Sequence, residues 1–186
     1  MNRGGLAGSV FELDDRYTAY DARSLAESGL DGGKMLIRIG LEDPGTARTL
    51  EHTARAVSEL AASGLMALVE PFMSNWDHGK LVNDLSADAV IKSVGIASGL
   101  GSTSSHTWLK VPVVDDMERV IESTTLPTLL LGGDPQGSDE EVFASWEKAL
   151  GLPGVRGLVV GRALLYPQND DVAAAVDVAA GLVARA

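Results

Sequence analysis

Three ionisable residues stand inside apolar segments, where a charged side chain is costly to strip of water. Lys34 lies in KMLIRI, Glu70 in LMALVEPF and Lys110 in TWLKVPVV. Apolar surroundings and a second cation favour the neutral amine of a lysine, which can attack a carbonyl carbon and form a Schiff base. Glu70 is then the expected acid–base group. For Lys110 taken alone, an exposed edge strand or a side chain that reaches back to water is the simpler explanation.

Two later apolar segments end in glycine, which suits a site for an anion. Gly132 and Gly133 end PTLLLGG, and Gly161 with Arg162 follows RGLVV. Glycine lets backbone N–H groups approach an anion closely, and arginine adds positive charge and a forked donor. These residues predict a phosphorylated substrate. Arg38 has the same strand parity as Lys34, so it is a further candidate for substrate contact.

The candidate residues lie on short apolar segments that alternate with amphipathic ones. The expected strands are 34–39, 65–72, 107–114, 127–133 and 156–161. Trp76, Asp77 and His78 are expected in a loop after the second of these strands. Strands of this kind, almost continuously apolar, are typical of a parallel sheet covered on both faces.

The intervening segments carry helix signals. The first helix is predicted from apolar residues at helical spacing, with Gly64 as its C-terminal glycine; those residues are Ala47, Leu50, Ala54, Val57, Leu60 and Ala61. Two later helices are expected to begin with capping boxes, formed by Asp115 with Glu118 and by Ser138 with Glu141. A final helix is predicted over about 170–185.

Two α/β architectures fit this alternation: an open doubly wound sheet and part of a (β/α)8 barrel. The doubly wound fold requires a glycine-rich loop after its first strand, whereas the glycines of NRGGLAGS precede the first clear strand. We therefore expect one α/β domain over residues 1–186, a partial TIM barrel. Because barrel strand ends converge on one face, the candidate residues should share a pocket.

The motifs resemble, in order, strands four to eight of the Schiff-base aldolases of the deoxyribose-phosphate and tagatose-bisphosphate aldolase superfamily. They are KMLIRI, LVEPF, WLKVPV, LLLGG and GLVVGR. The resemblance implies that Lys110 forms the imine, that Glu70 moves protons and that Lys34 assists or binds substrate. It also implies a phosphate site at Gly132, Gly133, Gly161 and Arg162. The implied activity is reversible aldol cleavage of a phosphorylated ketose or deoxy-sugar acid, without cofactor or metal.

The sequence departs from that superfamily in two places. Deoxyribose-phosphate aldolases carry a second lysine on strand seven, whereas PTLLLGGD has none, which disfavours that activity. Strands one to three have no counterpart except the end of unit three, which NRGGLAGSVFELDDRYTAYD resembles. The chain is therefore expected to be an N-terminally incomplete barrel that self-associates, because its outer strands lack protective prolines or charges other than Lys34 and Arg38, which are assigned to the site.

Composition excludes several other functions. The 186 residues have a formal net charge of −11, which argues against a nucleic-acid partner. No apolar run is long enough for a membrane helix, and no cysteine is present, so a soluble cytoplasmic protein is expected. The three histidines lack metal-ligand spacing. Three functions stay open: an imine-forming lyase or a related transaldolase-like or acyl-transferring enzyme, a sugar-phosphate-binding protein without turnover, and an inactive fragment.

Overall fold

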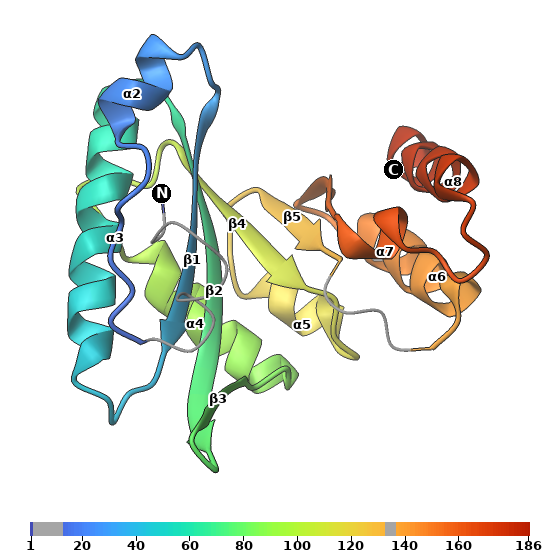
Figure 1. Cartoon of the computed structure of the whole chain (residues 1–186), viewed down its shortest axis with the longest axis horizontal. Helices are drawn as coiled ribbons and strands as arrows, with labels where there is room; N and C mark the ends of the chain where they lie inside the picture. Colours follow the sequence, from blue (N-terminus) through green and yellow to red (C-terminus); the bar gives the residue numbers. More distant parts are fainter. Residues whose placement is uncertain (2–12, 133–136) are drawn as a thin grey trace.

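The computed structural model describes residue 1 and residues 13–132 and 137–186 (Figure 1). Its strands are β1 (Gly32–Ile39), β2 (Met66–Asp77), β3 (Lys80–Asn83), β4 (Thr107–Pro112), β5 (Thr128–Leu131) and β6 (Val155–Val159). Its helices are α2 (Ala22–Glu27), α3 (Gly45–Ala62), α4 (Ala87–Ser98), α5 (Met117–Glu122), α6 (Asp139–Leu150), α7 (Arg162–Leu165) and α8 (Val172–Arg185). The five predicted strands are confirmed within a few residues at each end.

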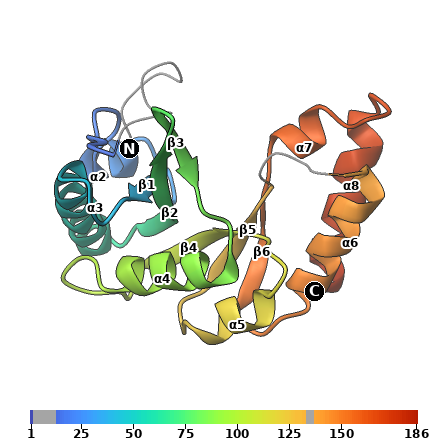
Figure 2. The same cartoon turned by 90° about the horizontal axis from the view of Figure 1, so that it is seen from below.

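Five of the strands form one parallel sheet in the order β1-β2-β4-β5-β6. Each strand therefore lies beside the next parallel strand along the chain, as in a barrel. In Figure 2, helices α3, α4, α5 and α6 follow one another along an arc outside these strands, and the arc opens between β3 and α7. The fold is a parallel α/β fold with the arrangement of a partial TIM barrel.

The two faces of the curved sheet are buried to different degrees. The face toward the helices carries fully buried side chains, among them Met35, Ile37, Val69, Leu109 and Leu130. The opposite, concave face carries the intervening residues, which are intermediate or exposed on β1 and at Trp108 and Lys110 of β4, but buried at Leu68, Glu70 and Phe72 of β2. Because most of the fully buried apolar side chains of the sheet lie on the helix side, the concave face can hold polar side chains.

Helix α3 packs on β1 through a face that matches the predicted one only in the second half of the helix. The predicted Val57 and Leu60 are buried, but nearer the start of the helix the buried residues are Thr46, Thr49 and Thr53, one position away from the predicted Ala47, Leu50 and Ala54. The threonine hydroxyls explain the difference, because they bond the chain segment 13–17. Thr49 accepts a hydrogen bond from the Asp15 backbone N–H and donates to the Leu13 carbonyl, and Thr53 bonds the Tyr17 hydroxyl.

The predicted loop at Trp76 and Asp77 is wrong, because β2 continues to Asp77 and pairs with β3 in an antiparallel hairpin. The two-residue turn has positive φ at His78 and Gly79, the backbone that a tight hairpin requires. Trp76 Nε1 donates to Asp43 Oδ2 at 2.8 Å, which fastens the hairpin to the segment after β1. The hairpin extends below the parallel sheet in Figure 1.

The predicted helix ends are partly confirmed. Ser138 and Glu141 form the expected capping box of α6, and Asp171 caps α8 through Ala174 N–H. The predicted box at Asp115 is wrong: α5 begins one residue later, with Asp116 as its N-cap residue. In the described parts of the chain, no helix has the length and apolarity needed to cross a membrane.

Candidate active site

Glu70 lies between the two lysines that the sequence singled out. Its Oε1 atom accepts a hydrogen bond from Lys110 Nζ at 3.0 Å, and its Oε2 atom lies 2.8 Å from Lys34 Nζ. The side chains of Glu70 and Lys110 are 8% and 13% exposed, whereas that of Lys34 is 43% exposed. Lys110 is therefore the amine that is better shielded from water.

Strand register brings these three residues together. Glu70 on β2 pairs with Leu36 on β1, so Lys34 lies two residues toward the amino ends of the strands and Arg38 two residues toward their carboxyl ends. On the other side, Val69 pairs with Leu109, which sets Lys110 beside Glu70. Alternate residues of a strand share a face, so all these charged side chains project from the concave face.

The second carboxylate oxygen of Glu70, Oε2, is buried and lies next to Lys34. Lys34 Nζ is within ion-pair distance of Oε2, but among the described residues no group meets the angular criteria for a hydrogen bond to this buried atom. Lys34 therefore acts on this oxygen through its charge rather than through a well-directed hydrogen bond.

A pocket of about 820 Å³ opens above Glu70 and Lys110 on the concave face. Most of the other predicted site residues line it, namely Arg38, Gly132, Gly161 and Arg162. Lys34 does not line it and reaches Glu70 from the side of the strand amino ends. Gly133 lies outside the described residues. At Gly132, a Cβ atom would lie 2.9 Å from Val160 Cγ1, so the close approach of the segments after β5 and β6 requires glycine.

Arg38 lies in a partly buried position between two carboxylates. Burial lowers the pKa of Arg38, and the negative charges of Asp15 and Glu70 act in the opposite direction. Asp15 is almost completely buried on the segment before α2. It was not among the sequence candidates, because nothing in LDDRY distinguishes it from surface acids such as Asp14.

The sequence also missed the wall of the pocket that follows the hairpin. Asn83, the last residue of β3, and Leu85 line the pocket together with Phe72. Ser74 Oγ donates a hydrogen bond to Asn83 Oδ1 at 2.8 Å, and Ser74 is buried. The signal available in the sequence was the DHGK turn, which would have extended the strand and placed Asn83 beside Ser74.

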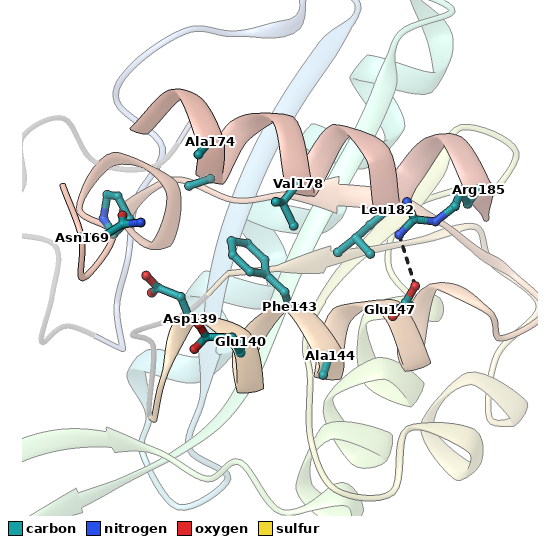
Figure 3. Close-up of a pocket in the computed structure, with 12 residues that line it drawn as sticks. Asp139, Glu140, Phe143, Ala144, Glu147, Asn169, Ala174, Val178, Leu182 and Arg185 are labelled. Carbon is teal, nitrogen blue, oxygen red and sulfur yellow. Dashed lines mark hydrogen bonds and ion pairs between the residues drawn. The ribbon is translucent and has the colours of Figure 1, made fainter. Parts of the chain in front are cut away.

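A second pocket, of about 490 Å³, lies between α6 and α8 (Figure 3). Phe143 and Val178 point into it from the two helices, and Arg185 pairs with Glu147 at one end at 3.2 Å. Its other ionisable lining residues in the described chain are Asp139 and Glu140. Such an acidic, apolar pocket does not suit a phosphorylated ligand.

Comparison with known proteins gives the family. The model of the Cgl0159-like family matches residues 1–180. The chain belongs to the Cgl0159-like family. The crystal structure of Cgl0159 from Corynebacterium glutamicum (Brevibacterium flavum) has 65% identical sequence and a TM-score of 0.94 over all of this chain. This Cgl0159-like chain spans 62% of the length of that protein.

More distant structures resemble the Cgl0159-like chain in fold. An archaeal fructose 1,6-bisphosphate aldolase has 18% identity and a TM-score of 0.75 over all of this chain and 69% of its own. A Schiff-base-forming fructose-1,6-bisphosphate aldolase has 20% identity and a TM-score of 0.70 over 90% of this chain and 64% of its own. At these identities the likeness shows the fold alone, that of Schiff-base fructose-bisphosphate aldolases.

Proposed function

We propose that this chain carries the catalytic part of a Schiff-base aldolase that cleaves a phosphorylated ketose or deoxy-sugar acid. We place it in the deoxyribose-phosphate and tagatose-bisphosphate aldolase superfamily, on its tagatose-bisphosphate side. The observation that carries the proposal is the contact between Lys110 Nζ and Glu70 Oε1 at the floor of the concave pocket. A shielded amine with a carboxylate at hydrogen-bond distance has the two groups that imine chemistry requires.

Imine formation begins when Lys110 passes a proton to Glu70. The neutral Nζ atom then forms a bond to the carbonyl carbon of the substrate, and the proton that Nζ loses passes to the carbonyl oxygen to give a carbinolamine. Glu70 returns its proton to the carbinolamine hydroxyl, which leaves as water. The product is an iminium ion on Lys110, which is the electron sink for the next step.

Carbon–carbon cleavage uses the same carboxylate. Glu70 removes the proton from the hydroxyl group on the far carbon of the bond to be broken. That oxygen then forms a carbonyl as the bond breaks. The bonding electrons move to the iminium nitrogen, giving an enamine and releasing an aldehyde. Protonation of the enamine carbon and hydrolysis of the iminium ion release the second product. Lys34 holds the carboxylate of Glu70 in position across a distance of 2.8 Å.

The phosphate of the substrate is assigned to the β5–β6 end of the pocket. Arg162 supplies positive charge there, and Gly132 and Gly161 supply backbone N–H groups that no Cβ atom shields. Arg38 contributes a second cation on the β1 side. In this account, the site uses charge and hydrogen bonds from the protein alone.

Borohydride trapping tests the proposal. The chain is incubated with dihydroxyacetone phosphate or fructose 1-phosphate, reduced with borohydride, digested and analysed by mass spectrometry. The proposed function requires a reduced adduct on the peptide that contains Lys110. Measurable binding of either compound, without any adduct, would instead support a sugar-phosphate-binding protein. This alternative uses the same cations in the pocket, Arg38 and Arg162, without the reaction.

A further inference from the structure

We propose that Asn83 is a specificity residue that binds the part of the substrate lying on the opposite side of the carbonyl from the phosphate. This inference rests on the proposed function, because it takes Lys110 as the position of the carbonyl carbon. It assigns to the β2–β3 hairpin a role in choosing substrates. The ligand group it would recognise is a hydroxyl of a polyhydroxylated carbon chain.

The hairpin places Asn83 on the same side of β2 as Glu70. Residues 70, 72 and 74 lie on the same face of the strand, and Asn83 pairs directly with Ser74 across the hairpin. Both Glu70 and Asn83 line the concave pocket. The amide of Asn83 is therefore presented to the cavity that contains the lysine and carboxylate pair.

Ser74 fixes the orientation of that amide. Its buried hydroxyl donates to Asn83 Oδ1 at 2.8 Å, so the acceptor end of the amide is already engaged. The Nδ2 hydrogens are then the groups that Asn83 offers to a ligand. A fixed donor at the wall of a pocket discriminates well, because a ligand without the matching oxygen leaves it unpaired.

Strand order shows which part of a substrate this donor meets. Lys110 is on β4, which lies between β2 and β5 in the sheet. Gly132 follows β5 and Arg162 follows β6, both on one side of Lys110. On the other side, Asn83 is the last residue of the β2–β3 hairpin and Leu85 comes after it. A ketose phosphate whose carbonyl is at Lys110 and whose phosphate is at Arg162 must extend its remaining carbons toward Asn83.

Two probes separate the ends of the pocket. Dihydroxyacetone phosphate and fructose 1-phosphate share a phosphate, a methylene group and a carbonyl, but fructose 1-phosphate carries a longer hydroxylated chain beyond the carbonyl. Dissociation constants are measured by calorimetry, and imine yields by borohydride trapping. The variant is Asn83→Leu, which keeps the side-chain size and removes the donor. The matched control is Asn75→Leu, in the same hairpin but exposed and not part of the pocket.

Asn83→Leu should weaken fructose 1-phosphate binding by roughly 3- to 12-fold, the range expected for one neutral hydrogen bond. Binding of dihydroxyacetone phosphate should change by less than about twofold, and Asn75→Leu should affect neither probe. Ser74→Ala should give a smaller loss, again for fructose 1-phosphate alone. A purely structural role would lower the thermal stability without separating the two probes.

The outcomes for Asn83 and for the imine are distinguishable. Selective weakening of fructose 1-phosphate binding without any borohydride adduct supports Asn83 and overturns the proposed reaction. If adducts form on Lys110 but Asn83→Leu weakens the binding of both probes equally, or of neither, the role of Asn83 is overturned and the proposed reaction stands. If the unaltered chain binds neither probe, both are overturned.

Discussion

Lys110 and Glu70 are 40 residues apart in the sequence, yet Lys110 Nζ donates a hydrogen bond to Glu70 Oε1 at 3.0 Å. The contact forms because β2 and β4 are neighbours in the sheet, although the hairpin strand β3 comes between them in the chain. Both side chains are largely buried. An ion pair in such a place costs hydration, so its retention favours a functional explanation over a stabilising one.

Substituting the carboxylate should separate its role from that of the lysine. Glu70→Gln keeps the shape of the side chain but cannot carry protons, so turnover of a cleaved ketose phosphate should fall by about 10²- to 10⁴-fold. An adduct on Lys110 should still form when trapping is allowed long incubation. Turnover is measured by coupled detection of the released aldehyde. A Glu70→Gln variant with unchanged turnover would remove Glu70 from the mechanism.

Loss of Arg162 should weaken phosphorylated ligands selectively. Arg162→Ala removes one charge-assisted contact, worth about 1.5–3 kcal/mol or roughly a 10- to 100-fold change in affinity. Unphosphorylated dihydroxyacetone should be almost unaffected. Arg156→Ala, an exposed arginine on β6 that does not line the pocket, is the control. Equal weakening of phosphorylated and unphosphorylated ligands would refute a phosphate site at Arg162.

The strands and their charged residues could be predicted from the sequence because the signal is local. Apolar segments of strand length, each bearing one charge, were enough to place Lys34, Glu70 and Lys110 on neighbouring strands. Parallel order then required that they converge. Their distances could not be predicted, since these depend on the register between β1, β2 and β4.

The rest of the pocket depends on tertiary contacts that have only a weak signal in the sequence. Because β2 was expected to end near Phe72, the hairpin was not predicted. Pro71 does not end the strand, because pairing with β4 stops at Val69 and Pro71 therefore interrupts no hydrogen bond to β4. Asn83 was missed as a consequence. Asp15 is distinguished from Asp14 only by burial, which arises from the packing of segment 13–17 on the threonines of α3.

Alkaline pH should destabilise the protein through Tyr17. Burial raises the pKa of Tyr17 above its usual value, and its hydroxyl bonds Thr53. Above pH of about 10, the phenol of Tyr17 ionises in the unfolded chain but not in the folded chain. The free energy of unfolding should therefore be constant below that pH and should fall as the pH rises further, by up to about 1.4 kcal/mol per pH unit.

Melting temperatures between neutral and alkaline pH test this expectation. Tyr17→Phe should flatten the alkaline decline, whereas Tyr20→Phe, at an exposed position, should leave it unchanged. Tyr17→Phe should also lower stability at neutral pH by about 0.5–1.5 kcal/mol through the lost hydrogen bond. An identical alkaline decline in both variants would exclude Tyr17 as its source.

The outer strands should promote association. In the described sheet, β1 and β6 each pair with one strand only. Such edges pair readily with another chain. Size-exclusion chromatography with light scattering should therefore give a mass above 19.4 kDa that rises with concentration. A monomer with full aldolase turnover at all concentrations would show that this chain does not depend on further strands.

The most direct test of the account is the position of the borohydride adduct. The unaltered chain, Lys110→Arg and the control Lys148→Arg, an exposed α6 residue, are incubated with dihydroxyacetone phosphate, reduced and analysed by peptide mass spectrometry. Arginine keeps the charge but supplies no neutral amine. We expect a stable adduct on the Lys110 peptide in the unaltered chain and in Lys148→Arg, and none in Lys110→Arg. An adduct on Lys34 instead, or undiminished labelling of Lys110→Arg, would contradict this expectation.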